Sequence, residues 1–204
     1  MYMKNKNGNQ IILLVGKSGT GKTTVSNILH DKYGYQVVES YTTRPPRFDG
    51  ETGHIFVTDD EYEQMKDDIC AFTEFDGNKY WATNKQVDRS DLYIIDPAGV
   101  EYFYEKYNGN KNIICMELAA SARIRFERMR NRGDSIIKAL RRLYHDAKAF
   151  KNSNPEILLN ANGSRPDYIA DKINYIATTM QKLDIEIKNA LKIVRNEGGE
   201  YDVY

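Results

Sequence analysis

The feature that most constrains this chain is the octapeptide Gly16-Lys17-Ser18-Gly19-Thr20-Gly21-Lys22-Thr23, which fits the phosphate-binding pattern G-x-x-x-x-G-K-[ST]. The apolar run 11–15 before it predicts a buried parallel strand. Apolar residues at helical spacing between 24 and 32 predict a helix that ends at Gly34. Strand, glycine-rich loop and helix follow in the order that a phosphate-binding loop requires, and this context disfavours the alternative of a chance glycine turn.

The chemistry of polyphosphate binding accounts for these residue types. Glycines let consecutive backbone N–H groups point inward at phosphate oxygens, and the N-terminus of the following helix adds positive potential. Lys22 is expected to contact the β- and γ-phosphates of ATP, and the Thr23 hydroxyl to bind the accompanying Mg²⁺. The loop residues expected to bind ATP are Gly16, Ser18, Gly19, Thr20, Gly21, Lys22, Thr23 and Thr24.

Strand-like segments alternate with helical sequence along the rest of the chain. Strands are expected at residues 11–15, 36–39, 91–96, 112–118 and 157–159. This alternation predicts an α/β protein, a three-layer P-loop NTPase fold with a five-stranded parallel sheet. Short strands, turns and one helix from 59 to about 69 indicate a small inserted α+β lobe. We expect a single domain, 1–204, with core 10–40, 91–120 and 151–195, inserted lobe 41–90 and helical lid 121–150.

Two helical segments complete the prediction. Residues 119–150 are expected to form an arginine-rich helix, a turn at 132–135 and a second helix. Residues 167–195 are expected to form one long helix, and 198–204 a disordered tail. Along that helix apolar residues recur every four and three positions, which fits either a helix covering one face of the sheet or a dimer seam. These positions are Ile169, Ile173, Ile176, Met180, Leu183, Ile187, Ala190 and Val194.

Composition narrows the partners and the compartment. The chain has 29 Lys+Arg and 29 Asp+Glu, so its overall charge predicts neither nucleic acid nor a membrane surface as partner. The two cysteines, Cys70 and Cys115, form neither a metal-binding spacing nor a disulfide framework, which favours reduced thiols. The first eight residues contain no apolar signal region, so we expect a cytoplasmic protein, monomeric or homodimeric.

An ordered set of motifs resembles the guanylate kinase family over roughly residues 11–185. The segments that carry the resemblance are 16–24, 40–47, 50–57, 72–74, 77–80, 95–100, 128–133, 141–143 and the strand that ends at Asn160. The resemblance implies transfer of the γ-phosphoryl group of ATP to GMP or dGMP, with Mg²⁺. In-line transfer to an anionic phosphate depends on positioning and charge neutralisation, so no general base is expected.

The resemblance also assigns residues to the acceptor. Arg44 and Arg47 would grip the acceptor phosphate in forked hydrogen bonds. Ser40 and Glu74 match positions that recognise guanine, whose ring N–H and amino group both donate to a carboxylate. The acceptor-binding residues that it implies are Ser40, Arg44, Arg47, His54, Glu74, Tyr80, Thr83 and Asp96.

The lid arginines are assigned by the same resemblance. Arg132 and Arg142, together with Lys22, would be catalytic because they stabilise charge on the transferred group. Arg128 and Asn160 match positions near the donor nucleotide. A solvated helix surface is the alternative for such arginines, and that is the interpretation adopted for Arg123, Arg125 and Arg130.

The sequence departs from the family pattern near the acceptor. His54 replaces a tyrosine, Ile94 replaces the first acid of an Asp-x-Asp pair, and Ala98 replaces a glutamine. The residue that replaces the threonine of the family's Tyr-Gly-Thr is ambiguous around Trp81. Three alternatives therefore stay open: a kinase for another nucleoside monophosphate or a sugar phosphate, a non-catalytic interaction domain of the same fold, and nucleic-acid binding by the arginine-rich segment.

Overall fold

The computed structural model describes residues 9–46 and 48–197. Its main sheet has four parallel strands in the order β6-β1-β7-β8, and β1 pairs with a neighbour on each side. The strands are β1 (Gln10–Gly16), β6 (Leu92–Ile94), β7 (Asn112–Ala119) and β8 (Ile157–Asn160). The loops that follow these strands therefore meet at one edge of the sheet, where ligands of open α/β sheets bind.

The expected fifth strand is not formed. Within residues 36–39 only Val37 makes an isolated bridge, to Leu92. The Gln36 N–H donates to the Asp91 carboxylate over 2.8 Å, and the chain enters a different sheet at Ser40. Pairing in this segment is therefore too short to make a strand, and the parallel sheet has four strands where five were predicted.

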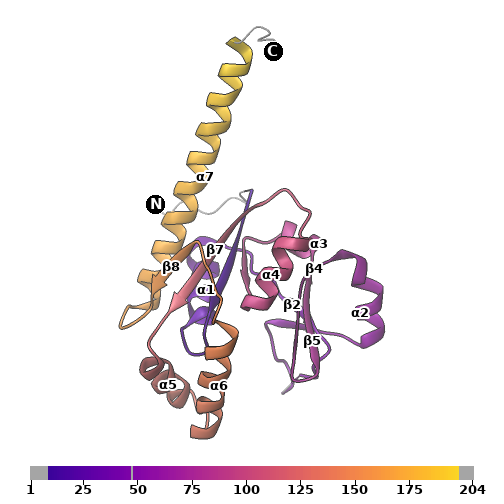
Figure 1. The fold of residues 1–204 in the computed structure, drawn as a ribbon, viewed down its shortest axis with the longest axis vertical. Helices are drawn as coiled ribbons and strands as arrows, with labels where there is room; N and C mark the ends of the chain where they lie inside the picture. Colours follow the sequence, from indigo (N-terminus) through magenta and orange to yellow (C-terminus); the bar gives the residue numbers. More distant parts are fainter. Residues whose placement is uncertain (1–8, 47, 198–204) are drawn as a thin grey trace.

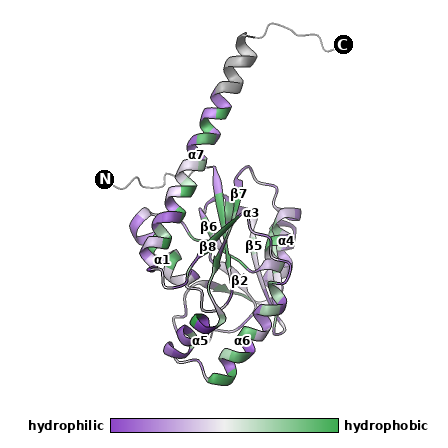
Figure 2. Ribbon diagram, turned by 60° about the vertical axis from the view of Figure 1, so that its left-hand side comes forward, coloured by the Kyte–Doolittle hydropathy of each residue, from purple (hydrophilic) through white to green (hydrophobic). Residues whose placement is uncertain are grey.

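Two apolar layers enclose the main sheet, as the three-layer prediction requires. Alternate residues of β1 face opposite sides: Ile12 and Leu14 lie in one buried cluster, and Leu13 and Val15 in the other. The first cluster packs α1 (Lys22–Tyr33) and the N-terminal half of α7 (Pro166–Glu197) against the sheet. The second cluster contains α4 (Pro97–Lys106) and part of the inserted lobe. Figure 2 shows the apolar strands between these layers.

The inserted lobe has its own four-stranded sheet in the order β3-β2-β5-β4. Its elements are β2 (Ser40–Thr42), β3 (His54–Phe56), α2 (Asp59–Met65), a 3₁₀ turn (Lys66–Asp68), β4 (Ile69–Phe75), β5 (Asn78–Thr83) and α3 (Asn84–Asp88). The hairpin turn between β4 and β5 has Asp76 and Gly77 at positive φ, as an Asp-Gly turn favours. Trp81, fully buried, stacks on Tyr41 in the lobe core.

The arginine-rich segment forms a helical hairpin. It consists of α5 (Ala122–Asn131) and α6 (Ile136–Ala149), capped by Ser121 and Ser135, with Gly133 at φ 96° between them. Figure 1 shows this hairpin beyond the end of the main sheet, beside α1 and away from the projecting helix α7. The expected helix–turn–helix is therefore present.

Helix α7 packs on the core with only its first half. Ile173 is fully buried, whereas Leu183 and Ile187 are 52% and 58% exposed. The second half projects from the body of the molecule (Figure 1). No helix in the described ranges, including α7, combines the length and apolarity needed to cross a membrane. The tail at 198–204 lies outside the described residues.

Both cysteines are free and buried. Burial raises the pKa of the Cys70 thiol to about 12 and that of the Cys115 thiol to about 11. The thiolate is the reactive form, so these side chains are inert packing groups in the described structure.

Candidate functional site

The phosphate loop connects β1 to α1 with the geometry that its glycines predict. A Cβ added to Gly16 would lie 2.8 Å from the Leu118 carbonyl oxygen, and one added to Gly19 would lie 2.7 Å from the Arg125 carbonyl oxygen. Gly21 is the N-cap of α1 at φ 102°, and no side chain caps the helix. The first N–H groups of α1 therefore keep the capacity to bind an anion.

Lys22 lies inside this loop. Its ammonium donates to the carbonyl oxygens of Gly16 and Lys17. Burial is the largest cause of a pKa lowered to about 8; Asp146 opposes this shift, while Arg132 and other nearby arginines add to it. Burial and nearby positive charge both disfavour the protonated lysine, and a bound polyanion would relieve both effects.

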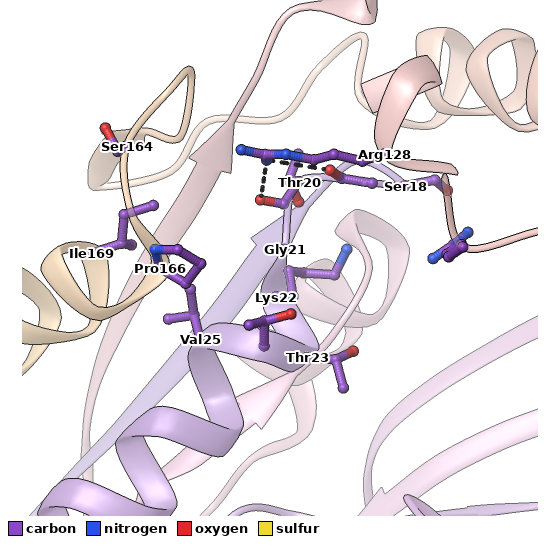
Figure 3. A pocket seen from close by; sticks show the side chains of 13 residues that line it. Ser18, Thr20, Gly21, Lys22, Thr23, Val25, Arg128, Ser164, Pro166 and Ile169 are labelled. Carbon is purple, nitrogen blue, oxygen red and sulfur yellow. Dashed lines mark hydrogen bonds between the residues drawn. The ribbon is translucent and has the colours of Figure 1, made fainter. Parts of the chain in front are cut away.

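A cavity of about 530 Å³ opens at the N-terminus of α1 (Figure 3). Residues 18–24, Arg128 and Arg132 line it, and we call it the donor cavity because ATP is expected to bind at these loop residues. Arg128 Nη1 donates to the Thr20 carbonyl oxygen over 3.1 Å, and Nη2 donates to the Ala161 carbonyl oxygen over 2.9 Å. Arg128 thus holds backbone carbonyl groups at the rim of this cavity.

The sequence gives no signal for the residues of the far wall of the donor cavity. Ser164, Pro166 and Ile169, at the start of α7, line it. No sequence motif marks these residues, because a long chain connection brings them to the loop. Asn160, expected near the donor, does not line the cavity; its Oδ1 accepts from the Asn162 N–H over 2.9 Å.

A second cavity, of about 500 Å³, lies between the phosphate loop, β4 of the inserted lobe and α6. It shares Ser18 and Lys22 with the donor cavity. Besides those two and Gly16, the expected site residues that line it are Glu74, Asp96 and Arg142. Residues outside the expected site line it too, among them Phe75, His145 and Asp146. Ring contact between Phe75 and His145, with centroids 5.1 Å apart, joins the lobe to the hairpin.

The remaining acceptor residues cluster in the lobe. Ser40 Oγ and His54 Nδ1 are 3.0 Å apart, and the His54 ring meets the Tyr80 ring edge-on at 5.7 Å. Arg44 donates to both carboxylate oxygens of Glu51. Arg47 lies outside the described residues.

Two further residues expected at the acceptor have clear local roles. Asp96 accepts from the Gly99 N–H over 2.7 Å and so caps α4 while lining the second cavity. Thr83 caps α3 in a reciprocal capping box with Gln86 and lines neither of the two cavities described above. The structure therefore places Thr83 apart from the group around Glu74.

Two of the departures from the family pattern lie in the second cavity. Ile94 and Ala98 both line it, next to Asp96. Apolar side chains therefore stand where the family pattern has an acid and an amide. The structure thus locates these departures in the cavity expected to bind the acceptor.

The Thr23 hydroxyl at the start of α1 suits a magnesium ion that is bound together with a polyphosphate. Thr23 is exposed at the start of α1 and lines the donor cavity. Within the residues described, no group of three or more His, Cys, Asp or Glu side chains forms a metal site. Mg²⁺ in phosphoryl-transfer sites is held by few protein oxygens together with phosphates and water, so a single hydroxyl suits this chemistry.

One expectation about the hairpin is wrong. Arg125, assigned to the solvated surface, is buried, and its Nη1 donates to the equally buried Asp146 over 2.8 Å. Arg132 instead keeps an exposed side chain and donates to Asp134 over 2.6 Å. Whether an arginine of this hairpin is buried or exposed depends on which helix face packs against the phosphate loop. Composition alone does not predict that face.

Comparisons with known proteins agree with this geometry. A family model described as an AAA domain matches residues 12–158. The guanylate kinase of Fusobacterium nucleatum is 29% identical over 82 residues, which span 38% of this chain and less than half, 44%, of that protein. The crystal structure of guanylate kinase from Anaplasma phagocytophilum matches with a TM-score of 0.60 at 23% identity, over 86% of this chain and 88% of that one. At this identity the structural match establishes the fold.

Proposed function

Since this chain belongs to the AAA-domain family of P-loop proteins and is guanylate-kinase-like, we propose that it transfers the γ-phosphoryl group of ATP to GMP or dGMP, with Mg²⁺. The coarser activity, that of a P-loop nucleotide kinase, is supported by the AAA-domain match and by the similarity to guanylate kinases. The choice of GMP or dGMP as the acceptor needs support from the residues of the site.

One observation carries the proposal: Lys22 and Ser18 line both cavities. The donor cavity begins at the anion-binding end of α1, and the second cavity contains Glu74 and Arg142. A phosphoryl group bound at Lys22 would therefore face an acceptor in the second cavity. In-line transfer needs this arrangement of two anions on either side of a fixed cation.

The arginine hairpin supplies the remaining charge. Arg132 lines the donor cavity and Arg142 lines the second one, so a positive side chain approaches the shared region from each side. Mg²⁺, when bound with the nucleotide at Thr23, neutralises the β- and γ-phosphates. Arg128 contributes indirectly, because its guanidinium holds the loop carbonyl groups of Gly19 and Thr20.

The acceptor lobe offers groups for a nucleoside monophosphate. Glu74 at the second cavity supplies a carboxylate that can accept from the ring N–H and the amino group of guanine. Arg44 Nε is buried and lacks a hydrogen-bond partner among the described residues, and a phosphate oxygen would satisfy it. Ser40, His54 and Tyr80 lie together in the lobe, and with Asp96 at the second cavity they would complete the acceptor surface.

A second candidate is a kinase for another nucleoside monophosphate or a sugar phosphate. It is favoured by Ile94 and Ala98, which make the wall of the second cavity apolar beside Asp96. This candidate uses the same donor site and the same arginines. It differs only in what Glu74 recognises.

The deciding experiment is an ADP-release assay with Mg²⁺-ATP across a panel of acceptors. The panel contains GMP, dGMP, AMP, CMP, UMP, dTMP and several sugar phosphates at equal concentrations. We expect turnover with GMP or dGMP at least about 10²-fold above the other acceptors, a ratio that paired hydrogen bonds to a base can produce. Turnover with another monophosphate alone would support the second candidate, and no turnover with any of them would reject a kinase of this class.

A further inference from the structure

A pair of buried charges beside the phosphate loop is not explained by nucleotide binding itself. The side chains of Arg125 and Asp146 are only 7% and 8% exposed, and they form an ion pair at 2.8 Å. Taking two charges out of water is costly unless they are paired and their remaining hydrogen-bonding groups are satisfied. A buried pair of this kind beside the second cavity, which Asp146 lines, therefore needs a reason.

The carboxylate of Asp146 joins three separate segments of the chain. It accepts from the Ser18 N–H over 2.9 Å and from the Ser18 hydroxyl over 3.2 Å, in addition to Arg125. Arg125 Nε donates in turn to the Ala120 carbonyl oxygen over 3.2 Å. The phosphate loop, α5 and α6 thus meet at one carboxylate, and every partner of that carboxylate is a donor.

Backbone contacts hold the neighbouring loop residues in the same way. Gly19 lies so close to the Arg125 carbonyl group that a side chain would clash there. Arg128 Nη1 donates to the Gly19 and Thr20 carbonyl oxygens. The hairpin therefore contacts loop residues 18, 19 and 20 in succession. None of these contacts uses the backbone N–H groups at the start of α1, which stay available for phosphate.

We propose that Asp146, oriented by Arg125, is a positioning residue that fixes the phosphate loop in its nucleotide-binding conformation and anchors the arginine hairpin to it. The inference rests on the proposed nucleotide-binding role of the loop. Because the Lys22 ammonium donates to the carbonyl oxygens of Gly16 and Lys17, just before Ser18, fixing Ser18 also fixes the loop around that ammonium. The hairpin then presents Arg132 and Arg142 as a preformed arm.

The experiment compares three variants with the wild-type protein. Asp146→Ala removes the carboxylate and leaves Arg125 buried without its partner, so a lower Tm is expected. The double variant Arg125→Met/Asp146→Leu removes both charges and keeps apolar volume, which should restore the Tm. Asp171→Asn is the control, because Asp171 pairs with Lys32 and bonds to Tyr33 outside both cavities. Each protein is measured by hydrogen exchange without nucleotide and by its Kd for ATP.

If Asp146 positions the phosphate loop, both Asp146 variants should lose the native conformation of that loop, even where the Tm of the double variant is restored. The amides of residues 18–21 should exchange at least about 10-fold faster, and the Kd for ATP should rise about 10-fold, as expected when a buried hydrogen-bonding partner is lost. Asp171→Asn should change neither. A double variant that regains both the wild-type Tm and the wild-type Kd would overturn the proposal, because the pair would then serve stability alone.

Three further outcomes bear on this inference and on its relation to the proposed function. Tighter ATP binding by Asp146→Ala would overturn the positioning role, since Asp146 would then compete with phosphate for Ser18. Suppose that the wild-type protein binds ATP and that the Asp146 variants show the expected changes, but that the wild-type protein phosphorylates no acceptor. The proposed function then fails and the positioning role stands. If wild-type protein does not bind ATP at all, the positioning role fails with it.

Discussion

The Arg44 guanidinium donates to both carboxylate oxygens of Glu51, over 2.9 and 3.2 Å, and both side chains are largely buried. Such a fork fixes the plane of the guanidinium, and it leaves Arg44 Nε without a hydrogen-bond partner in the described ranges. The pair therefore presents a fixed arginine donor in the lobe expected to hold the acceptor phosphate.

Replacing Arg44 tests that role. Arg44→Lys keeps the charge but loses the forked geometry, so we expect kcat/KM for the acceptor to fall about 10- to 100-fold. The KM for ATP should stay within about twofold of wild type, because Arg44 does not line the donor cavity. Arg165→Lys, at an exposed ion pair, is the matched control. An equal rise in both KM values would show that Arg44 supports the fold instead of binding the acceptor.

Glu74 is expected to determine the choice of base. Glu74→Gln replaces one acceptor oxygen with a donor amide, which would face the donors of guanine. We predict a loss of about 10²-fold in kcat/KM for GMP with little change in the KM for ATP. Steady-state kinetics with GMP and AMP measures the ratio. Unchanged preference for GMP would exclude Glu74 from base recognition.

Lys22 should be essential for turnover but not for folding. Lys22→Ala removes an ammonium that lies near arginines and, within the described part of the chain, donates to the carbonyl oxygens of Gly16 and Lys17. We expect kcat to fall by about 10²–10³-fold or more, because the cation acts on the transferred phosphoryl group. Circular dichroism and Tm should match wild type. Retained turnover in this variant would favour a non-catalytic phosphate loop, with activity arising elsewhere.

The same lysine makes ATP binding depend on pH. Without nucleotide the pKa of Lys22 is about 8, and burial is its main cause. Phosphate favours the protonated amine, so the pKa must be higher in the complex, and binding takes up a proton above pH 8. The affinity for ATP should therefore hold below about pH 8 and weaken as the pH rises further, by at most about tenfold per pH unit.

Calorimetry measures this linkage directly. Titrations of ATP from pH 7 to 9.5, in two buffers of different ionisation enthalpy, count the protons taken up. Lys22→Ala is the control, and its weaker binding should lose this pH dependence. A flat profile for the wild-type protein would mean that Lys22 stays charged throughout.

Helix α7 offers a matched pair of substitutions within one element. Ile173 is fully buried and Leu183 is 52% exposed, although both lie on the same periodic apolar stripe. Ile173→Ala should lower the free energy of unfolding by about 2–4 kcal/mol, and Leu183→Ala by no more than about 0.5 kcal/mol. Urea unfolding at two protein concentrations measures both. A concentration-dependent loss in Leu183→Ala would instead indicate pairing of two chains through α7.

Local patterns in the sequence were sufficient for most elements. The run 11–15 became β1, and the residues after the phosphate loop became α1, which ends at Gly34 in a left-handed conformation. These features depend on neighbours within a few residues, such as helical periodicity, glycine at positive φ and side-chain caps. The resemblance added the order of the lobe and hairpin, and the structure brings Glu74 and Asp96, expected at the acceptor, to one cavity with the lid residue Arg142.

Longer-range pairing decided what the sequence left open. The segment 36–39 has strand-like composition, but its pairing with β6 is limited to an isolated bridge at Val37. Thr83 resembled an acceptor residue, yet its hydroxyl accepts from Gln86 N–H at the start of α3. The first outcome depends on packing against β6, which a linear motif does not encode, whereas the second is a local capping box that competes with the role assigned to Thr83.

By itself the sequence determined an anion-binding loop between a buried strand and a helix, because that chemistry is written in eight consecutive residues. Only the tertiary structure decided what surrounds the loop. Asp146 lies 128 residues from Ser18, and Arg125 was indistinguishable from its exposed neighbours until α5 turned one face to the loop. Contacts between distant segments form only when the whole core is packed, so the second cavity and its buried ion pair belong to the fold.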